Sequence, residues 1–210
     1  VITHQVKEIR QEGEYYLVDE EYRARYLIGA GGTNCPVKRA LFEPEGQPVR
    51  GSLIVAQEEE FVYPGASRLC HLWFLQQGLP GYAWYFPKSE NVVNVGVGGS
   101  AARLKERGDT LRHHWELLTE RLYAYGLVRD HPFNPLGHSY YLRAAQPLLR
   151  KGNALLIGDA LGVSTLDMGE GIGPSIQSGI NAAMAIINHT PYTLDGISRY
   201  SFPSLLRLQR

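Results

Sequence analysis

The stretch from residue 155 to residue 183 constrains the fold most, because it joins an apolar run, a carboxylate, a glycine-rich turn and an apolar helix in that order. Asp159 follows the apolar run, so we expect its carboxylate at the carboxyl end of a buried strand, where ligands of open α/β sheets bind. Gly169, Gly171 and Gly173 let the backbone approach a ligand, and the first N–H groups of the next helix attract negative charge. An Asp in this place can also simply cap the next element. The joined pattern nevertheless predicts a cofactor site.

Two further stretches carry recognisable motifs. Residues 26–39 read Y-L-I-G-A-G-G-T-N-C-P-V-K-R, and residues 81–88 read G-Y-A-W-Y-F-P-K, with V-V-N-V-G-V-G following at 92–98. Together with Gly158–Gly173, and in this order, they resemble the geranylgeranyl reductase group of FAD-dependent oxidoreductases, which have the para-hydroxybenzoate hydroxylase fold. The resemblance covers nearly the whole chain. It implies an α+β / α/β fold class, in which part of an FAD-binding domain accompanies an antiparallel substrate-domain sheet.

The resemblance also implies roles for particular residues. Asp159 is expected to hydrogen-bond the ribityl chain of FAD, and the flavin ring is expected over the turn from Asp167 to Gly173. The remaining cofactor contacts implied are Gly158, Gly169, Gly171, Ile172, Gly29 and Gly31. The substrate contacts implied are Tyr82, Trp84 and Phe86, on a sheet that forms a wall of the lipid pocket in this family. Catalytic residues are not identified, and neither is the proton donor for reduction of a C=C bond.

The aromatic run from Tyr82 to Phe86 can be interpreted in two ways. Strand alternation puts Tyr82, Trp84 and Phe86 on one face, and Ala83 and Tyr85 on the other. A face with three aromatic residues is most often packed core, whereas a polyprenyl chain also needs an apolar, aromatic lining with few polar anchors. Both interpretations stay open at this point.

Two departures from the family pattern bear on the cofactor. Family members begin with a strand, a G-x-G-x-x-G turn and a helix whose N–H groups hold the FAD pyrophosphate, and no such segment precedes Val1. Gly31 also replaces the acidic residue of the family's A-D-G. The glycine runs at 29–31 and 96–101 are interpreted as turns. We therefore expect a fragment that binds FAD weakly or not at all and is inactive alone. NAD(P)H or another electron donor is left open.

Composition excludes several classes of protein. The 210 residues carry 21 basic and 21 acidic side chains, so a nucleic-acid footprint is not indicated. No apolar run approaches the roughly 20 residues that span a bilayer, and no signal peptide pattern begins the chain. These features predict a soluble, cytoplasmic protein, with peripheral membrane contact as an alternative and the oligomeric state open. Cys35 and Cys70 are expected to be small buried hydrophobic residues, and no metal motif is present.

Periodicity and turn signals divide the chain. We expect residues 1–48 and 146–190 to form the remainder of the FAD-binding domain, and residues 49–145 to form the substrate domain with one long helix. Residues 191–210 are expected to begin a C-terminal helical region, with a helix from Leu194 interrupted at Pro203. The long helix is predicted over Asp109–Tyr125 and the apolar helix over Ile172–Asn188. His113 and His114 are adjacent on the long helix, so they are not expected to share a metal ion.

Three functions remain from the sequence. The first is an FAD-dependent reductase that acts on C=C bonds of an isoprenoid of geranylgeranyl type or a similar apolar substrate. The second is a flavin-dependent monooxygenase or halogenase of the same fold. The third is a module without catalytic activity that binds lipid or a partner and has lost FAD.

Overall fold

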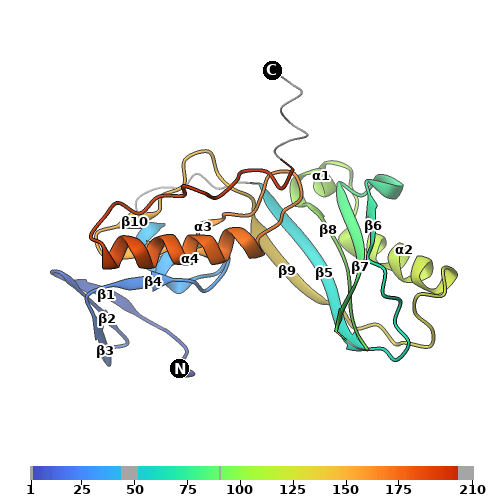
Figure 1. Cartoon of the computed structure of the whole chain (residues 1–210), viewed down its shortest axis with the longest axis horizontal. Helices are drawn as coiled ribbons and strands as arrows, with labels where there is room; N and C mark the ends of the chain where they lie inside the picture. Colours follow the sequence, from blue (N-terminus) through green and yellow to red (C-terminus); the bar gives the residue numbers. More distant parts are fainter. Residues whose placement is uncertain (1, 44–51, 90, 203–210) are drawn as a thin grey trace, which may run out of the picture. The chain divides into compact units, whose positions relative to one another are not determined.

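The structure is a computed structural model that describes residues 2–43, 52–89 and 91–202 (Figure 1). The chain divides into two compact units. Unit 1 combines residues 1–51 with residues 140–210, and unit 2 is the continuous segment 52–139. Unit 2 is therefore inserted between the two parts of unit 1 along the chain.

Unit 1 contains two small sheets. Strands β1 (Ile9–Glu12), β2 (Tyr15–Val18) and β3 (Tyr22–Ala24) form an antiparallel meander. The second sheet has the order β10 (Arg150–Lys151), β11 (Ala154–Leu156) and β4 (Leu27–Gly29), with β11 parallel to β4. The buried strand expected before Asp159 is thus formed as β11, at the centre of this sheet.

Three helical segments complete the elements of unit 1. A π-helical turn, η1 (Lys38–Phe42), follows β4, and the short helix α3 (Gly158–Leu161) follows β11. Helix α4 (Ile172–Ile187) agrees with the predicted helix to within one residue. It buries small side chains, namely Ser178, Ala182 and Ala185, and its opposite side exposes a stripe of large apolar residues.

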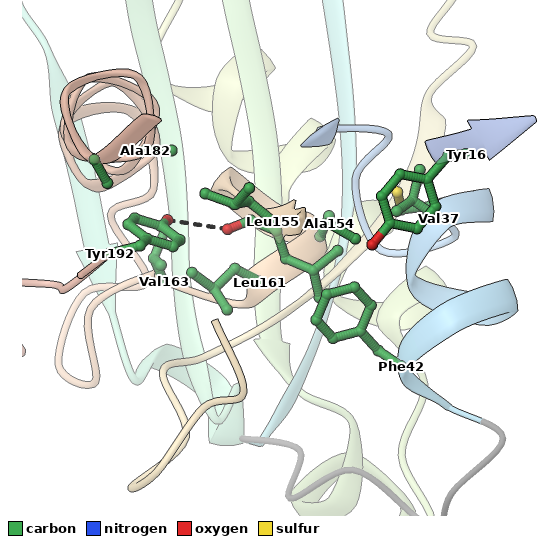
Figure 2. Close-up of a cluster of buried hydrophobic side chains, with 13 residues drawn as sticks. Tyr16, Val37, Phe42, Ala154, Leu155, Leu161, Val163, Ala182 and Tyr192 are labelled. Carbon is green, nitrogen blue, oxygen red and sulfur yellow. Dashed lines mark hydrogen bonds between the residues drawn. The ribbon is translucent and has the colours of Figure 1, made fainter. Parts of the chain in front are cut away.

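The core of unit 1 surrounds strand β11. Ala154 and Leu155 are fully buried, and they pack with Phe42 from η1 and Tyr16 from β2 (Figure 2). The Tyr192 hydroxyl donates a hydrogen bond of 3.0 Å to the carbonyl oxygen of Leu156, which Figure 2 shows as a dashed line. The chain beyond α4 is thereby tied to the strand that leads to Asp159.

Unit 2 is a five-stranded sheet of order β6-β7-β8-β5-β9. The strands, in chain order, are β5 (Leu53–Val62), β6 (His71–Phe74), β7 (Gly81–Ser89), β8 (Val92–Ser100) and β9 (Leu136–Tyr141). The pairs β5–β8, β6–β7 and β7–β8 are antiparallel. This arrangement confirms the antiparallel sheet expected for the substrate domain.

One face of this sheet is covered by helix α2 (Leu111–Ala124). Val93, Val95 and Val97 from β8 are fully buried there, and they pack with Leu118 and Leu122 from the helix. The Thr110 hydroxyl caps the helix by accepting a hydrogen bond from the His113 N–H at 3.2 Å. The shorter helices are η2 (Gln76–Gly78) and α1 (Ala101–Glu106).

The structure corrects three expectations. Residues Gly96–Gly99 lie within β8 and are not a turn, because both neighbouring strands pair along their whole length. No helix forms between Leu194 and Phe202, and the remainder of that prediction lies outside the described residues. Cys70 is exposed just before β6, whereas Cys35 is buried as expected.

Burial of Tyr192 generates a prediction for alkaline pH. The residue is only 7% exposed, and burial raises the pKa of its hydroxyl to about 12. An unfolded Tyr ionises near pH 10, so the folded state holds its proton more tightly than the unfolded state does between about pH 10 and pH 12. This contribution is fully present below pH 10 and is lost as the pH rises through 12, by about 3 kcal/mol in total.

Urea unfolding at pH 9 and pH 11 measures this effect. We expect Tyr192→Phe to reduce the loss of unfolding free energy between the two pH values, whereas Tyr200→Phe, at an exposed tyrosine, leaves the loss unchanged. An equal pH response in Tyr192→Phe and the unsubstituted chain would contradict the assignment.

Candidate functional site

Asp159 lies in the first turn of α3. Only Ile157 separates this helix from the end of strand β11. Gly158 joins strand and helix with φ of +57°, a left-handed conformation that favours glycine. The Gly158 N–H donates to the Ser178 hydroxyl of α4 at 2.9 Å. The position expected for Asp159 at the end of the buried strand is therefore the one that the structure has.

The electrostatic environment of Asp159 is unusual for a carboxylate. The side chain is half-buried, and burial raises its pKa, while the neighbouring Ser164 hydroxyl opposes the shift. Among the described residues, no basic side chain forms an ion pair with Asp159. Its oxygens thus remain available to accept hydrogen bonds from hydroxyl groups of a ligand.

The Ser164 hydroxyl is a second polar group at the same place. Ser164 is 1% exposed, and its Oγ atom has no hydrogen-bond partner of normal geometry within the described residues. A Cβ atom added at Gly171 would lie 2.8 Å from Ser164 Oγ and 3.5 Å from Asp159 Oδ1. The missing side chain of Gly171 therefore keeps open the space beside both oxygens.

The N-terminus of α4 is partly capped by the chain itself. The Gly173 N–H donates to Glu170 Oε1 at 2.8 Å, and residue 174 is a proline without an N–H. The Ile172 N–H has no partner among the described residues. At this helix terminus one N–H group has no partner among the described residues and a second is bound by a carboxylate, so fewer N–H groups are available to a ligand than the sequence predicts.

Other glycines expected to contact a cofactor have packing roles in the structure. A Cβ at Gly29 would lie 2.6 Å from a methyl group of Leu156, and one at Gly31 would lie 3.3 Å from the Cys35 backbone. A Cβ at Gly169 would lie 2.5 Å from the Tyr140 hydroxyl. These contacts explain the glycines without a ligand, and their part in cofactor binding stays a prediction.

Sequence reasoning missed two residues that shape the glycine-rich turn. The Thr165 hydroxyl accepts the Glu170 N–H at 3.0 Å and contacts the Ser201 hydroxyl at 2.8 Å. Asp167 accepts the Ser201 N–H at 2.8 Å and the N–H of the next residue at 3.1 Å, and these bonds together with the Met168 N–H lower its pKa against the effect of burial. The sequence does contain a signal for Asp167, since an Asp in a turn commonly accepts backbone N–H groups. It does not indicate that the N–H groups come from residues far along the chain.

In unit 2, the alternation expected along β7 is observed. Ala83 and Tyr85 are buried on the α2 face, while Tyr82, Trp84 and Phe86 lie on the other face and are half-buried. Successive ring centroids lie 5.5 Å apart from Phe74 to Tyr82, 5.8 Å from Tyr82 to Trp84 and 6.4 Å from Trp84 to Phe86. We call these four residues the aromatic row. The row is not part of the core that packs on α2.

Trp84 is fixed at the centre of this row. Its indole N–H donates to the Asn94 side-chain oxygen at 2.7 Å, and its ring lies against Gly96, where an added Cβ would overlap it. Asn94 faces Glu60, and Glu60 Oε2 accepts from Lys88 Nζ at 2.6 Å. The hydrogen bond from Lys88 is the largest of the contacts that lower the pKa of Glu60, and the hydrogen bond from Asn94 adds to it, while desolvation opposes both. The side chains of Asn94, Glu60 and Lys88 thus form a polar network that positions the indole ring.

His114 and His131 in unit 2 each pair with a carboxylate. His114 Nε2 lies 2.7 Å from Asp109, and His131 Nε2 lies 2.7 Å from Glu59. The hydrogen bond from the Thr110 N–H is the largest of the contacts that lower the pKa of Asp109. Within residues 2–43, 52–89 and 91–202 no group of His, Cys, Asp and Glu could hold a metal ion, and no helix is long and apolar enough to cross a membrane.

Comparison with known proteins identifies the relationship. Residues 54–122 match the geranylgeranyl reductase catalytic domain. This part of the chain is similar to the catalytic domain of geranylgeranyl reductases. A menaquinone reductase of Mycolicibacterium smegmatis is 32% identical over 132 residues, which is 61% of this chain and 31% of that protein. The resemblance expected from the three motifs is confirmed.

Solved structures confirm the fold. A geranylgeranyl bacteriochlorophyll reductase-like protein from Thermoplasma acidophilum has a TM-score of 0.69 at 20% identity, covering 97% of this chain and 53% of that one. The flavin-dependent halogenase CmlS has a TM-score of 0.58 at 17% identity, covering 88% and 36%, respectively. PqsL, a probable FAD-dependent monooxygenase from Pseudomonas aeruginosa, has a TM-score of 0.56 at 16% identity, covering 90% of this chain and 55% of that one. The chain thus spans about a third to a half of the length of these relatives.

The contact between Trp84 and Gly96 generates a second prediction. Gly96→Ala places a methyl group inside the indole ring, so we expect Trp84 to be displaced and the free energy of unfolding to fall by about 1–3 kcal/mol. Gly98→Ala is the matched control, because a Cβ there meets Ala56 at 3.5 Å, an ordinary contact. Urea unfolding and tryptophan fluorescence measure both effects. Equal behaviour of the two variants would show that Gly96 is not required beneath the indole.

Proposed function

We propose that this chain forms part of a flavin-dependent reductase that saturates C=C bonds of an isoprenoid or similar apolar substrate. The observation that carries the proposal is the aromatic row, which lies on the sheet face opposite the α2 core and is held by its own hydrogen-bond network. A wall of this kind is typical of pockets for apolar ligands. The match of residues 54–122 and the relationship to a menaquinone reductase support an isoprenoid substrate.

Unit 1 carries residues that fit a flavin. Asp159 is a half-buried acceptor without an ion pair among the described residues, and the buried Ser164 hydroxyl beside it has no hydrogen-bond partner of normal geometry there, so together they suit the hydroxyl groups of a ribityl chain. Gly171 leaves space beside them, and the Ile172 N–H suits an oxygen of the ring. A bound reduced flavin supplies the hydride for alkene reduction. The role of this chain is to bind and orient it.

The other functions are weighed by the same observations. Likeness to a halogenase and a monooxygenase at 16–17% identity supports the fold, whereas the family match in unit 2 is to a reductase. The fluorescence of flavin released from the purified full-length gene product would separate both enzyme classes from a lipid-binding module. Saturation of a prenyl chain under reducing, oxygen-free conditions would separate the reductase from an oxygen-activating enzyme.

Asp159 provides a test of the cofactor site. We expect Asp159→Ala to weaken flavin binding by about tenfold, because a buried charged acceptor is lost. The measurement is the flavin-to-protein ratio after dialysis. Asp195→Ala is the control, since that carboxylate is exposed and accepts from the Thr193 hydroxyl. Unchanged occupancy in Asp159→Ala would remove the support for this site.

Trp84 provides a test of the lipid site. We expect Trp84→Ala to weaken binding of geranylgeraniol by about tenfold through lost apolar contact, with the flavin-to-protein ratio unchanged. Tyr123→Ala, on the exposed side of α2, is the control. If both ligands are lost together in Trp84→Ala, the residue supports the fold and not the substrate.

A further inference from the structure

The sheet face of unit 2 that carries the aromatic row has a second, polar half. Glu58 and Glu60 on β5 point to this face, because they pair with Gly96 and Asn94, which alternate with the buried valines of β8. Glu58 Oε1 lies 3.1 Å from His138 Nε2 on β9, and Glu60 is paired with Lys88. We call Glu58, Glu60, Lys88 and His138 the polar half.

The two halves lie within reach of one molecule. Gly96 pairs with Trp84 on one side and with Glu58 on the other, so these two residues are separated by two strand spacings, or about 10 Å. Gly96 has no side chain that could stand between them, and the atoms nearest to an added Cβ there belong to the Trp84 ring. A ligand on the aromatic row can therefore place a head group over Glu58 and His138.

The charges of the polar half select the head group. Two carboxylates face one ammonium and one imidazole, so the net charge of the four residues is −1 or 0, depending on the protonation of His138. The five strands contain one other basic residue, His71. It stacks beside the core residue Trp73 on the α2 face. The described strands thus offer no cation that is free to neutralise a diphosphate, and two carboxylates repel one.

His138 is suited to a neutral oxygen-bearing head. Its side chain is 50% exposed, Nε2 is occupied by Glu58, and Nδ1 has no hydrogen-bond partner among the described residues. With Nε2–H directed at the carboxylate, Nδ1 accepts from a hydroxyl when the ring is neutral and donates to a carbonyl when it is protonated. The ring can therefore bind a hydroxyl or a carbonyl without needing an opposite charge on the ligand.

We propose that this face binds an uncharged amphipathic prenyl lipid, with its chain on the aromatic row and a hydroxyl or carbonyl head hydrogen-bonded to His138, and that it discriminates against prenyl diphosphates. The proposal rests on the proposed function and names the substrate class of that site. Glu58 and Glu60 determine the specificity, and His138 positions the head.

Two probes that share one chain test the proposal. Geranylgeraniol and geranylgeranyl diphosphate differ only in the head, and their affinities for the flavin-loaded protein are measured without reductant by quenching of tryptophan fluorescence. The readout is the ratio of the two affinities in each variant, since the ratio cancels the contribution of the shared chain. We expect Glu58→Gln combined with Glu60→Gln to shift this ratio toward the diphosphate by at least about tenfold.

A histidine pair completes the test. We expect His138→Phe to weaken the binding of geranylgeraniol by about fivefold, because one hydrogen bond is lost. His113→Phe, on the exposed surface of α2, is expected to leave this affinity unchanged. A ratio that does not change in the double variant, or geranylgeraniol binding that is insensitive to His138→Phe, would overturn the head-group assignment. If Trp84→Ala still weakens both probes in that case, the proposed function stands. If neither probe binds the unsubstituted protein, both proposals fail.

Discussion

The pairing of β8 with both β7 and β5 is the constraint on which unit 2 depends. It gives one strand two opposite faces with different chemistry. Val93, Val95 and Val97 form the core with α2, while Asn94 and Gly96 support the indole of Trp84. A shift of register by one residue would exchange these faces, burying an amide in the core and pushing valines into the indole. The stability of the core and the shape of the proposed lipid wall are therefore set by the same backbone hydrogen bonds.

Local patterns predicted much of this arrangement. Alternation along β7 placed Trp84 opposite Tyr85, and the apolar run before Asp159 placed its carboxylate at the end of a buried strand. Both patterns are properties of consecutive residues, so they can be read from the sequence without knowing which segments contact one another in the fold. The interpretation of Gly96–Gly99 as a turn failed for the opposite reason. What requires glycine there is the ring of Trp84, and the sequence does not say that the two residues are neighbours across the sheet.

The same limit explains the part of unit 1 that could not be predicted. The apolar residues after Leu194 suggested a helix, but the N–H groups of Ser201 and Phe202 are bound by Asp167, more than thirty residues earlier. A carboxylate that holds two consecutive amides competes with helix formation, because those amides are the donors that a helix would use. Glu170 has the opposite effect at α4, where its carboxylate accepts the Gly173 N–H and caps the first turn of the helix. The partners of Asp167 lie far away in the sequence, so they could be found only in three dimensions.

The inserted position of unit 2 has a consequence for the order in which the chain folds. Strand β4 pairs with β11 in parallel, and all of unit 2 lies between them along the chain. Closing so long a loop costs conformational entropy before any contact is gained, whereas the hairpin of β7 and β8 joins near neighbours. Once the hairpins of unit 2 have collapsed on α2, the loop is effectively shorter. Because a ribosome makes the chain from the N-terminus onward, β4 stays without its partner strand until all of unit 2, and then β11, has emerged.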